Sequence, residues 1–192
     1  MRPLTPALAL LLAACGSAAD APQGEATRIV FDEAGPPPAR AFPSPDTSDA
    51  FWRVAASGQA VDFGNDGEPP LLSLACDLTD AAAPQFVIIR HAEALPGQEA
   101  LFPFVGNGMS RRFLADTVLV DGEWRWEARL PAASTQLEIF EGPREMIATL
   151  PGRGTLEMRG SRIPGEFLAW CRAGGELPEV EGDETGGSEE AR

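Results

Sequence analysis

The chain has 192 residues, of which 44% are hydrophobic and 23% are charged, and its net charge is −14 at pH 7. This length suits one folded domain of ordinary size with flexible ends. The 29 acidic residues outnumber 15 cations, all of them arginine. Because binding to a phosphate backbone requires a basic surface, the composition excludes nucleic acid as an expected partner.

The chain begins like a secretory precursor. Arg2 and the amino terminus supply a positive start, and the apolar run from Leu4 to Leu12 is too short to span a bilayer. The sequence Leu12-Ala13-Ala14-Cys15 resembles the cleavage and lipidation site of bacterial lipoprotein precursors. The resemblance implies that residues 1–14 are a signal peptide and that Cys15 carries the lipid.

The residues after Cys15 bear on where such a lipoprotein would reside. Gly16 stands where an aspartate would resemble an inner-membrane retention signal, so we expect the outer membrane, with the protein facing the periplasm. A lipid with several chains would hold a domain on the membrane without a spanning helix, since each buried methylene contributes about 0.8 kcal/mol. The alternative is ordinary secretory cleavage after Ala18 or Ala19.

Both ends of the remaining chain have the composition of solvated segments. Residues 15–48 are rich in proline and glycine, with few large apolar side chains, which predicts a flexible tether. Residues 175–192 hold seven acidic residues and one arginine, which predicts a disordered, solubilising tail. The predicted folded domain therefore spans residues 49–174.

Within this domain, short runs of alternating polarity predict antiparallel strands. The plainest run is residues 124–130, where Trp124, Trp126, Ala128 and Leu130 share one face and charged side chains share the other. Asp121-Gly122 predicts a tight hairpin turn that joins this run to a partner strand over residues 113–120. We expect the first face in the core and the second in water.

The remaining runs complete an all-β prediction. Strands are expected over Leu71–Cys76, Gln85–His91, Gln136–Phe140, Arg144–Leu150 and Thr155–Met158. Two stretches are ambiguous: Gln98–Phe104, which Pro103 limits to a turn or two of helix, and Gly165–Arg172, which is a short helix or the last strand and is assigned to strand. Eight or nine antiparallel strands around one core imply a β-sandwich or a flattened barrel.

Cys76 and Cys171 form an even pair once Cys15 is set aside. In an oxidising compartment we expect them to form a disulfide, with two buried free thiols as the alternative. Closing the loop between residues 76 and 171 lowers the conformational entropy of the unfolded chain, which corresponds to about 4.5 kcal/mol of stability in the loop-entropy description.

His91 is the only histidine, and it lies at the end of a predicted strand. A position at the rim of the core or at a strand end, on the same face as Ile89, is expected rather than a catalytic base. Oxygen ligands crowd at Asp62, Asn65, Asp66 and Glu68, as calcium sites require, but their spacing does not follow an EF-hand loop. A polar hairpin turn is expected here, so we assign no metal and no cofactor.

The other features are less specific. A pair of carboxylates is the minimum for glycoside hydrolysis, but the many acidic residues do not single out one pair. The four tryptophans would stack on sugars only if exposed, and the alternation places them in the core.

The domain also resembles a group of alphaproteobacterial lipoproteins. The similar segments are Leu72-Ser73-Leu74-Ala75-Cys76-Asp77, Gly106-Asn107-Gly108, Trp124-Arg125-Trp126-Glu127, Phe140-Glu141-Gly142-Pro143-Arg144 and Ala169-Trp170-Cys171-Arg172. Those lipoproteins come from GC-rich genomes, have no assigned activity, and supply no functional residues.

The sequence predicts a membrane-anchored, non-catalytic binding or accessory module of the cell envelope, working within a protein complex. One alternative is a small-ligand or glycan binder, which requires a cavity in the core or an exposed tryptophan. The other is an envelope hydrolase, which requires two carboxylates facing one cleft, at least one of them desolvated.

Overall fold

The computed structural model describes residues 41–176. The predicted signal peptide, Cys15, most of the tether and almost all of the acidic tail lie outside the described residues. The elements, in chain order, are β1 (Phe51–Val54), β2 (Ala60–Gly64), β3 (Leu72–Asp77), β4 (Gln85–Arg90), β5 (Glu99–Gly106), β6 (Met109–Val120), β7 (Glu123–Pro131), the 3-10 helix η1 (Thr135–Phe140), β8 (Met146–Thr149), β9 (Thr155–Met158) and α1 (Ile163–Arg172).

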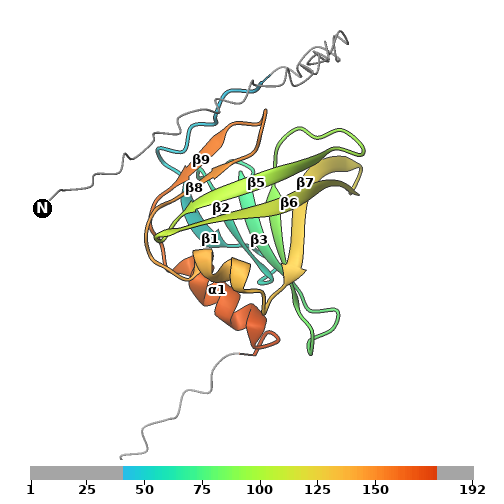
Figure 1. The fold of residues 1–192 in the computed structure, drawn as a ribbon, viewed down its shortest axis with the longest axis vertical. Helices are drawn as coiled ribbons and strands as arrows, with labels where there is room; N and C mark the ends of the chain where they lie inside the picture. The colour runs from blue at the N-terminus through green and yellow to red at the C-terminus, as the bar shows by residue number, and fades with distance from the viewer. Residues whose placement is uncertain (1–40, 177–192) are drawn as a thin grey trace, which may run out of the picture. The chain divides into compact units, whose positions relative to one another are not determined.

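The nine strands form one antiparallel sheet in the order β1-β2-β3-β4-β7-β6-β5-β8-β9. The sheet curls into a flattened barrel, with β5 and β6 crossing in front of β1, β2 and β3 (Figure 1). This confirms the predicted all-β fold with eight or nine strands. The edge strands β1 and β9 approach each other at a seam, where residues of β1 and residues 159–161 line a common groove.

Aromatic side chains fill the barrel. The ring of Phe104 lies 5.4 Å from the rings of both Phe113 and Phe140, and Phe86 packs against Phe140 and Phe167. The four phenylalanines at positions 86, 104, 113 and 140 are at most 1% exposed. Helices α1 and η1 lie across one end of the barrel (Figure 1), so these contacts join the end cover to the strands.

The assignment of residues 165–172 to a strand is wrong, because these residues belong to the α-helix α1. Pro164 lies at the first or second helical position, where its missing N–H costs no helical hydrogen bond. The buried side chains Pro164, Phe167, Leu168 and Cys171 recur at helical spacing, so one stripe faces the core. The stretch is too short for alternation and helical periodicity to be told apart by eye.

Two other segments also differ from the prediction. Residues 136–140 are helical rather than extended, since Ser134 caps η1 by accepting a hydrogen bond from the Gln136 N–H. Residues 99–106 form strand β5 rather than a helical turn. Pro103 is tolerated there because β8 pairs only with Phe104–Gly106, so Pro103 lies outside that ladder. The short strands β1 and β2 were not among the predicted strands.

Cys76 and Cys171 are joined by a disulfide with a Cα–Cα distance of 5.7 Å. Cys76 lies near the end of β3 and Cys171 in the last turn of α1. The bond thus holds the end-covering helix to a central strand. The expected link between the end of the domain and its beginning is present, although a helix provides it.

Candidate functional site

His91 follows directly after β4 and lies in a chain of polar side chains on the outer surface of the barrel. Ser73 Oγ lies 2.5 Å from Asp62 Oδ1 and 2.8 Å from His91 Nε2. Asp62 and Ser73 are cross-strand partners on β2 and β3, which places both side chains on the same face. The predicted position of His91 at a strand end is confirmed.

The proton order in this chain differs from that of a catalytic serine. Ser73 has one hydroxyl proton, and it is donated to Asp62, so the His91 Nε2–H donates to the serine oxygen. A nucleophilic serine instead donates to histidine, and the acid orients the other ring nitrogen. Ser73 is only 5% exposed, so its oxygen is also shielded from a substrate.

Burial, followed by the positive charge of Arg125, lowers the pKa of His91 to about 4. The imidazole is therefore neutral at physiological pH. A neutral ring with Nε2 protonated fits the donor role that the hydrogen bond to Ser73 assigns to it.

The predicted polar hairpin over Asp62, Asn65, Asp66 and Glu68 does not gather its oxygens around one point. Asp62 bonds Ser73, whereas the Asn65 side-chain amide donates to Glu68 Oε2 at 3.1 Å and to the Asp46 carbonyl at 3.3 Å. Within residues 41–176, no group of three His, Cys, Asp or Glu side chains is arranged to hold a metal ion.

Two carboxylates do face one groove, on the outer surface of β3, β4 and β7. Asp77 and Glu127 line a groove of about 490 Å³, and Glu127 is 7% exposed. Arg129 lies between them, 2.7 Å from Asp77 Oδ2 and 3.6 Å from Glu127 Oε2, and Arg125 donates to Glu127 at 2.8 Å. The expectation that this face of β7 is fully wet is wrong for Glu127, which the two arginines cover.

This groove is poorly suited to glycoside hydrolysis. A general acid must carry a proton at the working pH. Hydrogen bonds from the hydroxyl and N–H of Thr79, with a contribution from Arg129, hold the pKa of Asp77 below its ordinary value. Both carboxylates are committed to guanidinium groups, so neither is free to act on a substrate.

Two tryptophans are in the core as predicted, and two are partly exposed. Trp52 and Trp126 are 5% and 4% exposed, whereas Trp124 and Trp170 are half-buried. Trp124 lines a groove of about 510 Å³ with His91, Asp121, Glu123 and Arg125 among its other residues. The glycan-binding alternative requires an exposed tryptophan, and Trp124 meets that requirement only in part.

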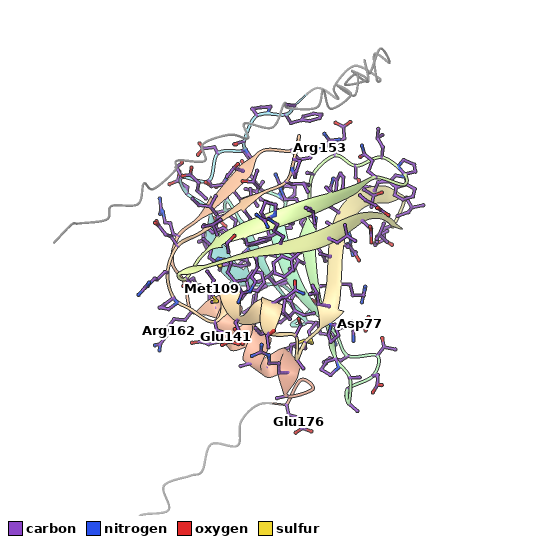
Figure 2. The ribbon with its side chains drawn as sticks, viewed as in Figure 1. Asp77, Met109, Glu141, Arg153, Arg162 and Glu176 are labelled. Carbon is purple, nitrogen blue, oxygen red and sulfur yellow. A yellow bond between two sulfur atoms is a disulfide. The ribbon has the colours of Figure 1, made fainter. Side chains whose placement is uncertain are left out.

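A pair of buried arginines closes the barrel end away from α1, where Figure 2 labels Arg153. Arg90 Nη1 donates to the carbonyls of Leu71 and His91, and Nη2 donates to the Arg153 carbonyl at 3.3 Å. Burial lowers the pKa of Arg90 to about 10. The guanidinium of Arg153 lies over the Phe42 ring at 4.7 Å. These contacts join the segments around residues 71, 91 and 153 to one another.

A different kind of groove lies along β9, an edge strand that pairs only with β8. Residues 44–48 run beside β9 and are tied at two points. The Thr155 N–H donates to Ser44 Oγ at 2.9 Å, and the Arg159 guanidinium donates to the Ser48 carbonyl. Between them lies a groove of about 660 Å³, here called the edge groove, which is lined by residues 44–48, 145–147, 155 and 157–159.

Sequence reasoning missed the edge groove. It assigned residues 44–48 to the tether, and the two ties join residues 111 positions apart in the chain. The one local signal is Gly154, whose φ is +80° and whose missing Cβ would lie 2.6 Å from Ser44 Cα. A glycine in a turn does not by itself reveal which segment approaches it.

Within residues 41–176, no helix combines the length and apolar character that a bilayer crossing requires. Comparison with protein-family models, with curated proteins and with solved structures finds no match to this chain.

Proposed function

We propose that this protein is a lipid-anchored, non-catalytic binding module of the bacterial cell envelope, held by Cys15 on the outer membrane and facing the periplasm. The observation that carries the binding role is the edge groove, an open groove between residues 44–48 and the edge strand β9. The barrel interior is filled by aromatic rings, so ligands are expected on the outside rather than inside. Partners are expected to be components of an envelope complex.

The non-catalytic part of the proposal is supported by the polar clusters described above. Ser73 is shielded and bonded to Asp62, and Asp77 and Glu127 are bridged by Arg129. Within the described domain, the first cluster is held by hydrogen bonds and the second by ion pairs with arginine. Such clusters stabilise a surface rather than present a reactive group.

A small-ligand or glycan binder is the second candidate. Trp124 favours it, since a half-buried ring beside Asp121 and Glu123 offers a stacking face together with hydrogen-bond acceptors. Trp124→Ala would remove sugar binding if this groove were the functional one, and would leave binding at the edge groove unchanged.

The anchor is tested by detergent-phase partition of the Cys15→Ser chain expressed in a bacterial host. We expect the unaltered protein in the detergent phase and the variant in the aqueous phase, because removing the thiol removes the acyl chains. The matched control is Cys76→Ser/Cys171→Ser, which replaces the two disulfide-bonded cysteines but keeps Cys15. Retention of Cys15→Ser in the detergent phase would contradict the lipid anchor.

A further inference from the structure

The backbone of β9 has hydrogen-bonding groups that point into the edge groove. In the β8–β9 hairpin the Leu150 N–H donates to the Gly154 carbonyl, which makes that pair hydrogen-bonded. Antiparallel ladders alternate, so the Ala148–Leu156 and Met146–Met158 pairs bond across the hairpin, and Thr155 and Glu157 direct their backbone groups away from β8. The donation from the Thr155 N–H to Ser44 agrees with this alternation.

Residues 44–48 leave the middle of this edge uncovered. Their two ties lie at Thr155 and Arg159, on either side of Glu157. Within residues 41–176, no hydrogen bond joins this segment to the N–H or C=O of Glu157. An uncovered donor and acceptor on an edge strand are the groups that pair with an added strand.

The charged side chains that line the edge groove are mostly acidic, and they determine the charge of the segment that the groove would bind. Asp46, Glu145 and Glu157 line the groove and are exposed, against a single cation, Arg159. The N–H of Ser48 donates to Asp46 Oδ1 at 2.9 Å, which helps to keep that carboxylate ionised. A basic segment would therefore be attracted to the groove and an acidic one repelled.

An apolar residue is exposed beside these carboxylates. Ile147 is the cross-strand partner of Glu157, lines the edge groove and is 43% exposed. Both side chains stand on the outer face of the sheet, so an added strand would place alternate side chains next to them. A segment that alternates basic and apolar residues fits this face.

We propose that the edge groove binds an extended, basic segment of a partner protein, which adds to the sheet beside β9 and pairs with the backbone of Glu157. The inference rests on the proposed function and deepens it, since it names the class of partner that the module holds. Main-chain pairing would give affinity, and the carboxylates would select charge.

The test is amide hydrogen exchange of the full chain in mild detergent, with synthetic peptides as probes. The first peptide alternates lysine and valine over seven residues. The second alternates glutamate and valine, and the third is the basic peptide N-methylated at alternate backbone nitrogens, which keeps its charge but removes its donors. We expect the basic peptide to slow exchange at Glu157 by about tenfold or more, and the other two to have no effect.

Two amino-acid changes sharpen the test. Glu157→Arg is expected to weaken binding of the basic peptide by about threefold to tenfold, because it reverses one charge of the groove. Glu99→Arg makes the same charge change at the exposed start of β5 and is expected to leave binding unchanged. A melting curve of each variant establishes that it is folded.

Four results would overturn the proposal. These are an absence of protection with the basic peptide, equal protection by its N-methylated form, slow exchange at Glu157 before any peptide is added, and equal protection at Val54 on the other edge strand, β1. Each would leave the anchor intact, because partition of Cys15→Ser is measured without peptide. Failure here is thus distinguishable from failure of the proposed function.

Discussion

Ser73 donates its hydroxyl proton to Asp62 and accepts a hydrogen bond from His91, so the three side chains form a chain with serine in the middle. The arrangement provides hydrogen-bond partners for the nearly buried hydroxyl of Ser73 and the partly buried imidazole of His91 on the outer face of the barrel. It makes His91 a structural donor whose neutral form is the one that the folded state holds. That preference has a consequence for stability as the pH changes.

We expect the free energy of unfolding to fall as the pH drops from about 6.5 to about 4. In this range the unfolded histidine binds a proton, whereas the folded one, with a pKa of about 4, does not. The unfolded state therefore gains protons, and stability is lost by up to about 3 kcal/mol. Urea unfolding across this range measures the slope.

His91→Gln provides the control, because the glutamine amide can still donate to Ser73 but does not titrate. The variant is expected to lose the part of the slope that His91 contributes between pH 4 and 6.5. Asp46 and Asp77 have lowered pKa values and start to reduce stability from about pH 5 downward, but they do so in both proteins, so the difference between the two slopes reports His91. An equal slope in both proteins would show that His91 is not the group responsible.

At the level of elements, the hairpin between β8 and β9 shapes the edge groove. Gly152 and Gly154 both have positive φ, at +74° and +80°. The Phe42 N–H donates to the Gly152 carbonyl at 3.0 Å, but only at Gly154 would an added Cβ meet another segment. A methyl group at Gly154 would meet Ser44 Cα and the Pro43 carbonyl, whereas one at Gly152 would meet nothing within 4 Å. Comparing an alanine substitution at each glycine therefore separates the effect of backbone strain from the effect of contact with residues 43 and 44.

Gly154→Ala is expected to destabilise the protein more than Gly152→Ala. Both changes introduce the strain of a positive φ, about 1–2 kcal/mol, and only the first also displaces residues 43 and 44. The displacement should break the tie from Thr155 to Ser44, so the Thr155 amide should exchange faster in Gly154→Ala alone. Equal exchange at Thr155 in the two variants would contradict the contact.

The sequence predicted the elements whose side-chain pattern is long and regular. β7 and the Asp121-Gly122 turn follow directly from alternation and turn chemistry, and β9 was placed with its observed bounds. The prediction was wrong for α1, η1 and β5. The run of α1 is too short to separate the two periodicities, Ser134 caps η1, and Pro103 made β5 resemble a broken helix. The conformations of these elements depend on contacts distant in the chain, as with the α1 stripe that packs under Phe86.

The candidate site shows the same division. The position of His91 at a strand end and the pairing of Cys76 with Cys171 were predicted from spacing and residue type. The hydrogen bonds of His91 to Ser73, and of Ser44 to Thr155, join separate strands and segments and carry no local signal. The role of these residues therefore depends on which distant segments pair with each other. The pattern of a single sequence does not predict that pairing.

For the whole molecule, three features combine in the account proposed here: an anchor at Cys15, a rigid barrel held to its end cover by the disulfide, and an edge groove near the start of the described residues. The described chain begins at Ala41, three residues before the groove. Because side chains fill the interior of the barrel, a partner is expected to bind on its outer surface.

The most direct test is photo-crosslinking in intact bacterial cells of the species of origin, with a photoreactive residue at position 147 in the edge groove. We predict an adduct of defined mass that disappears with Glu157→Arg, and no such adduct from the same residue placed at position 54 on β1. Absence of an adduct from position 147, or the same adducts from both positions, would contradict the claim that this protein is a binding module that uses the edge groove.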